Sequence, residues 1–80
     1  MISKTVKSSN LDTLDYDEKT QKLIVTFISG GVYEYSNVEP EIFDAIISEK
    51  FTNQKGQPSC GATFVKLIKN NPKYKYKKIN

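Results

Sequence analysis

The chain has 80 residues, which predicts a single domain. It has no histidine, which excludes histidine-based catalysis, and one cysteine, which excludes an internal disulfide and a zinc or iron–sulfur site within one chain. Residues 1–49 hold all nine acidic residues and four lysines, whereas residues 50–80 hold eight lysines and no acid. We therefore expect a protein that is not an enzyme and has no metal or cofactor. Its basic part either meets an anionic partner, such as RNA or a nucleotide, or is only a solvated tail.

Three strands are expected, at residues 10–16, 22–28 and 32–36. In the first, Leu14 and Tyr16 share one face and Leu11 lies on the other. The second is β-branched and apolar on both faces, so we expect helices on one side and another copy of the chain on the second. A Ser-Gly-Gly turn joins it to the third strand. Together these segments predict a three-stranded antiparallel meander.

Two helices are expected after the strands, at residues 40–49 and 61–70. Pro40 suits the first turn of a helix, and the spacing of Ile42, Phe43, Ile46 and Ile47 is that of an amphipathic helix. The final KYKYKKIN forms a short edge strand or an ordered tail. The order predicts an α+β fold with both helices on one face of the sheet, and with residues 1–8 and 77–80 frayed.

Tyr33 and Tyr35 lie two residues apart in an expected strand, so their side chains share a face. If that face is exposed, the rings form a platform on which a base stacks. The alternative is that one or both rings pack under the first helix, as aromatic residues do in small domains.

Small residues surround the expected start of the second helix. Ser59, Gly61 and Thr63 are suited to hold a phosphate there, beside backbone N–H groups. The alternative is that Ser59 only caps the helix. A helix start also lowers the pKa of a thiol such as that of Cys60, although no base is near it in the sequence to support catalysis.

Lysines and a further tyrosine complete the expected site. Lys66 and Lys69 are spaced i, i+3 and so share a face of an α-helix, while Tyr74 adds an aromatic wall from the tail. The alternatives are a solvated basic face and a tyrosine that fastens the tail to the sheet. Amide side chains in residues 53–57 are suited to reading base edges. We expect the helix start, the lysines and the tyrosines to form one ligand site.

An ordered set of residues resembles the KTSC domain, a family named after the C-terminus of some lysyl-tRNA synthetases and also found as stand-alone bacterial and phage proteins. The set is Ser8-Ser9-Asn10-Leu11, Leu14, Tyr16-Asp17, residues 23–27, Gly31, Tyr33-Glu34-Tyr35, Val38, Pro40 and Phe43. A looser match continues through Ser59, Gly61, Phe64, Ile68-Lys69 and Tyr74, so the resemblance covers roughly residues 8–76. Residues 51–58 look like an insertion, and Lys69 stands where the family tends to have arginine, which weakens a bidentate phosphate contact.

This resemblance implies RNA binding. A second one, to small phage proteins that act as sponges for immune nucleotide signals (anti-CBASS), implies a homo-oligomer without enzymatic activity. We therefore expect a non-enzymatic nucleotide-binding protein, a phage immune-evasion sponge for cyclic nucleotides. The alternatives are an RNA- or tRNA-binding accessory domain and a protein-interaction module that inhibits a host protein. No membrane segment or secretion signal is predicted, so the expected location is the cytoplasm, that of the host if a phage encodes the chain.

Overall fold

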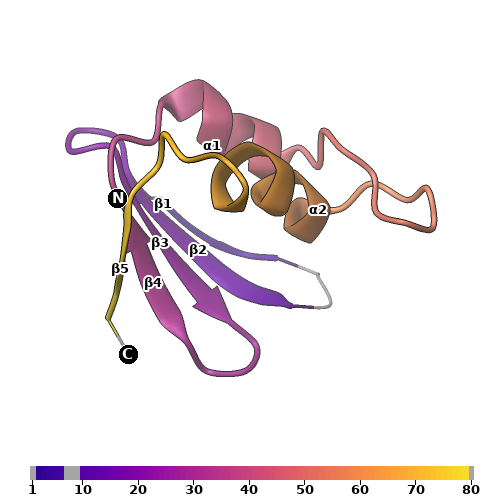
Figure 1. Cartoon of the computed structure of the whole chain (residues 1–80), viewed down its shortest axis with the longest axis horizontal. Coiled ribbons are helices and arrows are strands. Elements are labelled where there is room, and N and C mark those ends of the chain that lie inside the picture. Colours follow the sequence, from indigo (N-terminus) through magenta and orange to yellow (C-terminus); the bar gives the residue numbers. More distant parts are fainter. Residues whose placement is uncertain (1, 7–9, 80) are drawn as a thin grey trace.

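The structure is a computed structural model that describes residues 2–6 and 10–79. Its elements are β1 (Ile2–Thr5), β2 (Leu11–Asp17), β3 (Lys22–Phe27), β4 (Val32–Tyr35), α1 (Pro40–Ile47), α2 (Cys60–Phe64), η1 (Val65–Lys69) and β5 (Tyr76–Lys78) (Figure 1). The strands pair in the order β1-β2-β3-β4-β5, and every pair is antiparallel. Because η1 continues α2 as a π-helix, the chain has the two helices and the α+β fold that we expected.

The sheet has five strands where the sequence predicted three. Strand β1 comes from residues 1–8, which were expected to be frayed. Strand β5 agrees with the edge-strand alternative for the C-terminal segment, although residues 77–80 were expected to be frayed; residues 1, 7–9 and 80 lie outside the described part. Every side chain of both strands is exposed, so neither shows the burial that produces an alternating pattern. Backbone pairing with β2 and β4 holds these edge strands, and composition does not reveal such pairing.

One face of the sheet carries the core. Tyr16, Leu23 and Tyr35 are direct cross-strand neighbours and therefore point to the same side. The ring of Tyr16 stacks on Phe43 of α1 with the ring centres 4.6 Å apart, and Tyr35 meets Phe64 of α2 edge to face at 5.5 Å. Both helices consequently cover this one face, as expected (Figure 1).

A β-bulge corrects the expected orientation of Leu11. The pairing of β2 with β3 shifts between Leu11 and Thr13, so that Asp12 is an extra residue in β2. This insertion turns Leu11 to the helix-covered face, where it is buried together with Leu14 and Tyr16. Simple alternation had placed Leu11 on the opposite face.

The second face of the sheet is polar over most of its area. Asp15, Ile24 and Glu34 are cross-strand neighbours on it, and all three are half-buried. Lys22 forms an ion pair with Glu34 there, with 3.6 Å between nitrogen and oxygen. Burial of this face against another copy of the chain stays a prediction.

Candidate functional site

A pocket of about 590 Å³ lies between the β3–β4 hairpin, β5 and the end of η1. We call it the tyrosine pocket; its lining residues are Phe27, Ser29, Gly31, Tyr33, Tyr35, Lys69, Tyr76 and Lys78. The hairpin turn beside it requires Gly30, whose φ of +102° is unfavourable for any residue with a side chain. The volume is within the range of small-molecule sites, roughly 300–1,000 Å³.

The aromatic rings of this pocket support one another. Tyr76 is 63% exposed, and its ring centre lies 5.5 Å from that of Tyr33 and 5.6 Å from that of Tyr35. Phe27 packs edge to face against Tyr33 at 5.5 Å. The result is an aromatic wall with Tyr35 buried at its base and Tyr76 open to solvent, an arrangement on which a planar ligand can stack.

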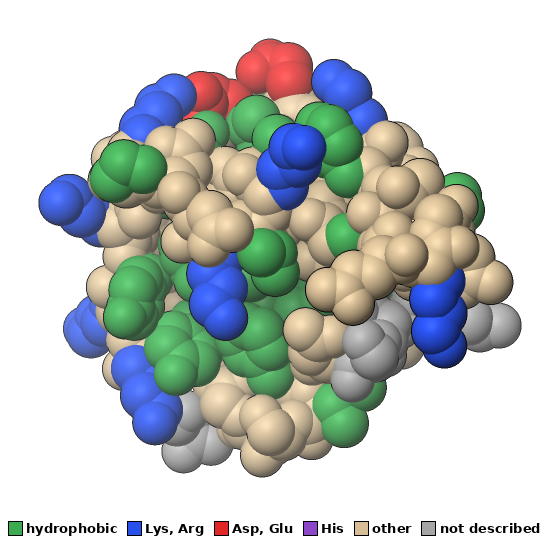
Figure 2. Space-filling view, turned by 45° about the vertical axis from the view of Figure 1, so that its right-hand side comes forward, with side chains coloured by type: hydrophobic (Ala, Val, Ile, Leu, Met, Phe, Trp, Pro, Cys, Tyr) green, Lys and Arg blue, Asp and Glu red, His purple; other side chains and the backbone are tan. Residues whose placement is uncertain are grey.

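The charged groups lining the tyrosine pocket are all positive. Lys69 reaches it from the helix and Lys78 from β5, and no acidic residue is among the described residues that line it. Figure 2 shows hydrophobic side chains gathered on one face of the molecule with lysines around them, and the acidic side chains only at the upper edge. A pocket of this kind favours a ligand that has both an aromatic ring and negative charge.

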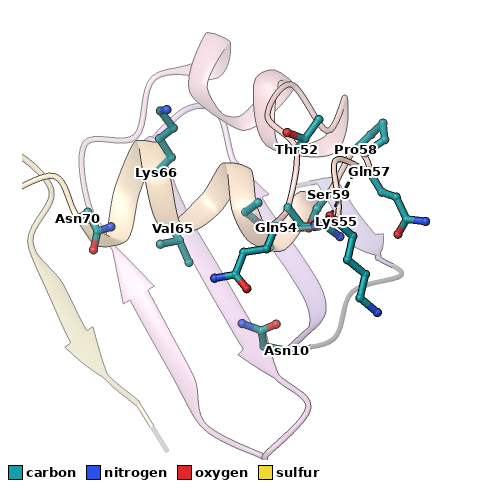
Figure 3. Close-up of a pocket in the computed structure, with 13 residues that line it drawn as sticks. Asn10, Thr52, Gln54, Lys55, Gln57, Pro58, Ser59, Val65, Lys66 and Asn70 are labelled. Atoms are coloured by element: carbon teal, nitrogen blue, oxygen red, sulfur yellow. Dashed lines mark hydrogen bonds between the residues drawn. The ribbon is translucent and has the colours of Figure 1, made fainter.

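A second pocket, of about 1150 Å³, lies between the long loop that precedes α2, the helix and Asn10 just before β2. We call it the amide pocket because its lining includes Asn10, Gln54, Gln57 and Asn70, together with Lys55 and Lys66 (Figure 3). Gln54 from the loop and Asn10 from the start of β2 point toward each other across it (Figure 3). Within residues 2–6 and 10–79, this pocket also has no acidic lining residue.

Hydrogen bonds hold the loop that forms the amide pocket. The side-chain oxygen of Asn53 accepts from the backbone N–H groups of Lys55 and Gln57, at 2.9 and 3.1 Å. Gly56 takes a φ of +75° at the tip, and Thr52 bridges to Pro58 at the base. The Nζ atom of a lining lysine, Lys66, lies 4.8 Å from the centre of the Phe51 ring beside this loop.

The structure divides the expected single site into two. Tyr33, Tyr35 and Lys69 line the tyrosine pocket, whereas Ser59, Gly61 and Lys66 line the amide pocket. Thr63 and Tyr74 line neither pocket. Lys66 and Lys69 separate because the helix is π-helical from Val65 onward, so a spacing of three residues no longer keeps two side chains on one face.

The hydroxyl groups at the start of α2 have structural partners. The Oγ atom of Ser59 accepts from the Ala62 N–H at 3.1 Å and so caps the helix. Thr63 is fully buried; its hydroxyl donates to the Ser59 carbonyl at 2.8 Å and accepts from the Phe51 N–H at 3.0 Å. Thr63 thus joins the loop to the helix and is not available to a phosphate.

Tyr74 fastens the C-terminal segment to the start of α1. It is buried, and its hydroxyl donates to the Glu39 carboxylate at 2.8 Å, while the Lys73 Nζ atom contacts the same carboxylate at 2.6 Å. The hydrogen bonds from Lys73 and then Tyr74 lower the pKa of Glu39 to about 2. Burial, followed by the bond to Glu39, raises the pKa of the Tyr74 phenol.

Cys60 is buried at the start of α2, and its environment opposes reactivity. Desolvation, and then the charge of Glu49, raise the pKa of its thiol, whereas the sequence had suggested that the helix start lowers it. Among the described residues, no three acidic or cysteine side chains come together as metal ligands. The same part of the chain contains no helix long and apolar enough to span a bilayer.

Sequence reasoning missed Tyr76 and Lys78 as lining residues of the tyrosine pocket. Both face the pocket because they pair with Tyr35 and Tyr33 across β4 and β5. The signal was the alternation in the C-terminal KYKYKK, which places Tyr76 and Lys78 on one face if the segment is read as a strand.

The KTSC domain model matches residues 7–74. The chain belongs to the KTSC domain family. A KTSC domain protein from Yersinia pestis has a similar solved structure, with a TM-score of 0.79, 25% sequence identity, and coverage of 99% of this chain and 97% of that one. The comparison confirms the expected family and supports the five-stranded α+β fold.

Curated relatives include a lysine–tRNA ligase from Nostoc punctiforme, which is 35% identical over 74 residues. The match covers 92% of this chain but only 11% of the ligase. An uncharacterized protein from Stutzerimonas stutzeri is 43% identical over 42 residues, which cover 52% of this chain and 59% of that protein. This KTSC domain therefore corresponds to a small part of the ligase and to somewhat more than half of the shorter relative.

Proposed function

We propose that this KTSC domain binds a nucleotide in the tyrosine pocket without catalysing a reaction. The base stacks on the exposed ring of Tyr76 beside Tyr33, and Lys69 and Lys78 meet the phosphate. The observation that carries the proposal is the combination of an aromatic wall with two lysines in a pocket that no acid lines. A base stacked on an aromatic side chain gains about 1–3 kcal/mol.

Titration of the full chain with nucleotides tests this proposal. We expect Tyr76→Ala to raise Kd by about 5- to 150-fold, the range that corresponds to loss of one stacked base, and Tyr76→Phe to change it little because the ring remains. Lys69→Ala should also weaken binding, whereas Lys19→Ala, in the distant β2–β3 turn, should not. If Tyr76→Ala binds as tightly as the unmodified chain, the tyrosine pocket is not the site.

RNA is the second candidate ligand, and one specific observation favours it. The Nostoc punctiforme protein whose segment resembles this chain is by name a lysine–tRNA ligase. Salt should weaken the binding of a single strand. The logarithm of the binding constant falls linearly with the logarithm of the salt concentration, with a slope of about −0.7 for each phosphate that the protein neutralises. A cyclic dinucleotide has only two phosphates, so a slope clearly steeper than two phosphates allow would identify RNA as the ligand.

The narrower hypothesis of a cyclic-nucleotide sponge for phage immune evasion requires a homo-oligomer, because a sponge must enclose its ligand to release it slowly. The enclosing copy has to cover the tyrosine pocket on the helix-covered side, and what supports such a contact is the exposed ring of Tyr76 there. Sedimentation with and without cyclic dinucleotides tests this hypothesis. A monomer under both conditions would argue against the sponge, and recovery of a protein partner without any nucleotide would favour a protein-interaction module.

A further inference from the structure

We propose that the ligand is a single-stranded polynucleotide that runs from the tyrosine pocket into the amide pocket, and that the amide pocket selects the base bound there. The proposal rests on the proposed function, to which it adds the class of ligand and the residues that set selectivity. It is carried by chain and hydrogen-bond neighbours that link the two linings, by the different chemistry of the pockets and by the absence of acidic residues among the described residues that line them.

Residues that line the two pockets are neighbours at two places. Lys69 lines the tyrosine pocket, and the next residue, Asn70, lines the amide pocket. On the sheet side, the Asn10 carbonyl of the amide pocket accepts from the Ile28 N–H at 2.8 Å, and Ile28 follows directly after Phe27 of the tyrosine pocket. Ile28 is 59% exposed, so apolar surface is also present at this junction. In this proposal the strand passes from one pocket to the other across these neighbouring residues.

The two pockets offer different kinds of recognition. Aromatic stacking in the tyrosine pocket accepts any base, because every base has a flat apolar face. The amide groups of Gln54, Gln57 and Asn70 make no side-chain hydrogen bond within residues 2–6 and 10–79, so their donors and acceptors are open to a ligand; Gln54 points toward Asn10, whereas Gln57 extends outward from the loop (Figure 3). Amides match the edges of bases, which display neighbouring donors and acceptors. Selectivity is thus expected in the amide pocket and tolerance in the tyrosine pocket.

The charge and the form of the pockets favour a single strand over a duplex. Lys55 lines the amide pocket and, with Lys69 and Lys78 of the tyrosine pocket, is the lysine that we expect to contact a phosphate backbone; the Lys66 ammonium group points away from Gln54 and Asn10 and lies over the Phe51 ring (Figure 3). In a duplex the base faces are stacked and the edges paired, so neither pocket can be filled without unpairing. RNA and DNA share the chemistry used here; a contact to the 2′-hydroxyl would distinguish RNA.

The test measures fluorescence anisotropy of the full chain with labelled oligonucleotides, from one to eight nucleotides long, in RNA and DNA forms and with each base repeated. We expect affinity to rise by about tenfold or more between one nucleotide and the length that fills both pockets. The double variant Gln54→Ala/Gln57→Ala should remove this gain and flatten the preference among bases, yet leave mononucleotide binding unchanged. Lys19→Ala serves as the control, and circular dichroism verifies that each variant is folded.

The outcomes separate this inference from the proposed function. Equal affinity for a mononucleotide, a cyclic dinucleotide and an octanucleotide would overturn the two-pocket path and leave nucleotide binding in the tyrosine pocket intact. The same holds if the double amide variant keeps both the gain with length and the base preference. If the chain binds no nucleotide of any length, the proposed function fails and the inference fails with it.

Discussion

The Glu39 carboxylate joins the C-terminal segment to the start of α1, and from its contacts we predict how the stability of this domain depends on pH. Hydrogen bonds from Lys73 and Tyr74 lower the pKa of Glu39 from its ordinary 4.5 to about 2. Because the folded-state pKa is the lower one, Glu39 stabilises the fold above about pH 4.5, and this contribution disappears as the pH falls toward 2. Glu39→Gln should therefore be destabilising at neutral pH and nearly neutral near pH 2.

The magnitude follows from the pKa shift after a correction for exposure. At 1.36 kcal/mol per pH unit the whole shift corresponds to about 3 kcal/mol. The Glu39 side chain is 34% exposed and its partner Lys73 is 59% exposed, so solvent screening reduces the expected loss to about 1 kcal/mol. In a domain of this length, such a loss lowers the midpoint of thermal unfolding by about 4–8 °C.

The assay is thermal unfolding followed by circular dichroism, at about pH 7 and about pH 3, for the unmodified chain, Glu39→Gln and the control Glu41→Gln. Glu41 lies in the first turn of the same helix and forms no ion pair within the described residues. We expect the difference between Glu39→Gln and the unmodified chain to shrink markedly at the lower pH. A loss of equal size at both pH values, or an equal effect of Glu41→Gln, would refute the argument.

Two further predictions concern the start of α2. Thr63→Val leaves the Phe51 N–H without its acceptor and should cost about 1–3 kcal/mol in urea unfolding, whereas Thr63→Ser keeps the hydroxyl and should cost less. Cys60 is buried and the pKa of its thiol is raised, so a thiol reagent should modify it much more slowly in buffer than in denaturant. Immediate modification of the folded chain would contradict that prediction.

The sequence predicted those parts of the fold in which burial leaves a periodic pattern. The central strands β2, β3 and β4 and the amphipathic helix α1 fall within a few residues of the expected positions. Helix α1 ends at Ile47 rather than at residue 49, because Glu49 adopts a left-handed conformation with φ of 56°. The edge strands β1 and β5 bury no side chain, so β1 was not predicted and β5 was predicted only as one of two alternatives for the C-terminal segment.

The sequence predicted several residues of the candidate site, but not how the fold brings them together. A period of two correctly placed Tyr33 and Tyr35 on one face, yet only the pairing of Val25 with Tyr33 and of Leu23 with Tyr35 shows that this is the face under the helices. Both line the tyrosine pocket, but Tyr35 is 5% exposed and belongs to the core, whereas Tyr33 is only partly buried. Cross-strand register is a property of the whole sheet, and local spacing does not determine it.

The tyrosine pocket depends on two contacts that fix the chain just before the edge strand β5. Tyr74 is buried, and its hydroxyl donates a hydrogen bond to the Glu39 carboxylate. The Ser36 N–H donates to the Lys75 carbonyl at 3.2 Å. Only then does Tyr76 pair with Tyr35 and present its ring to solvent. On a tail without these contacts, Tyr76 would take up many conformations, and binding a ligand would have to pay the entropy of ordering it. The buried Tyr74 therefore makes the exposed Tyr76 available for binding.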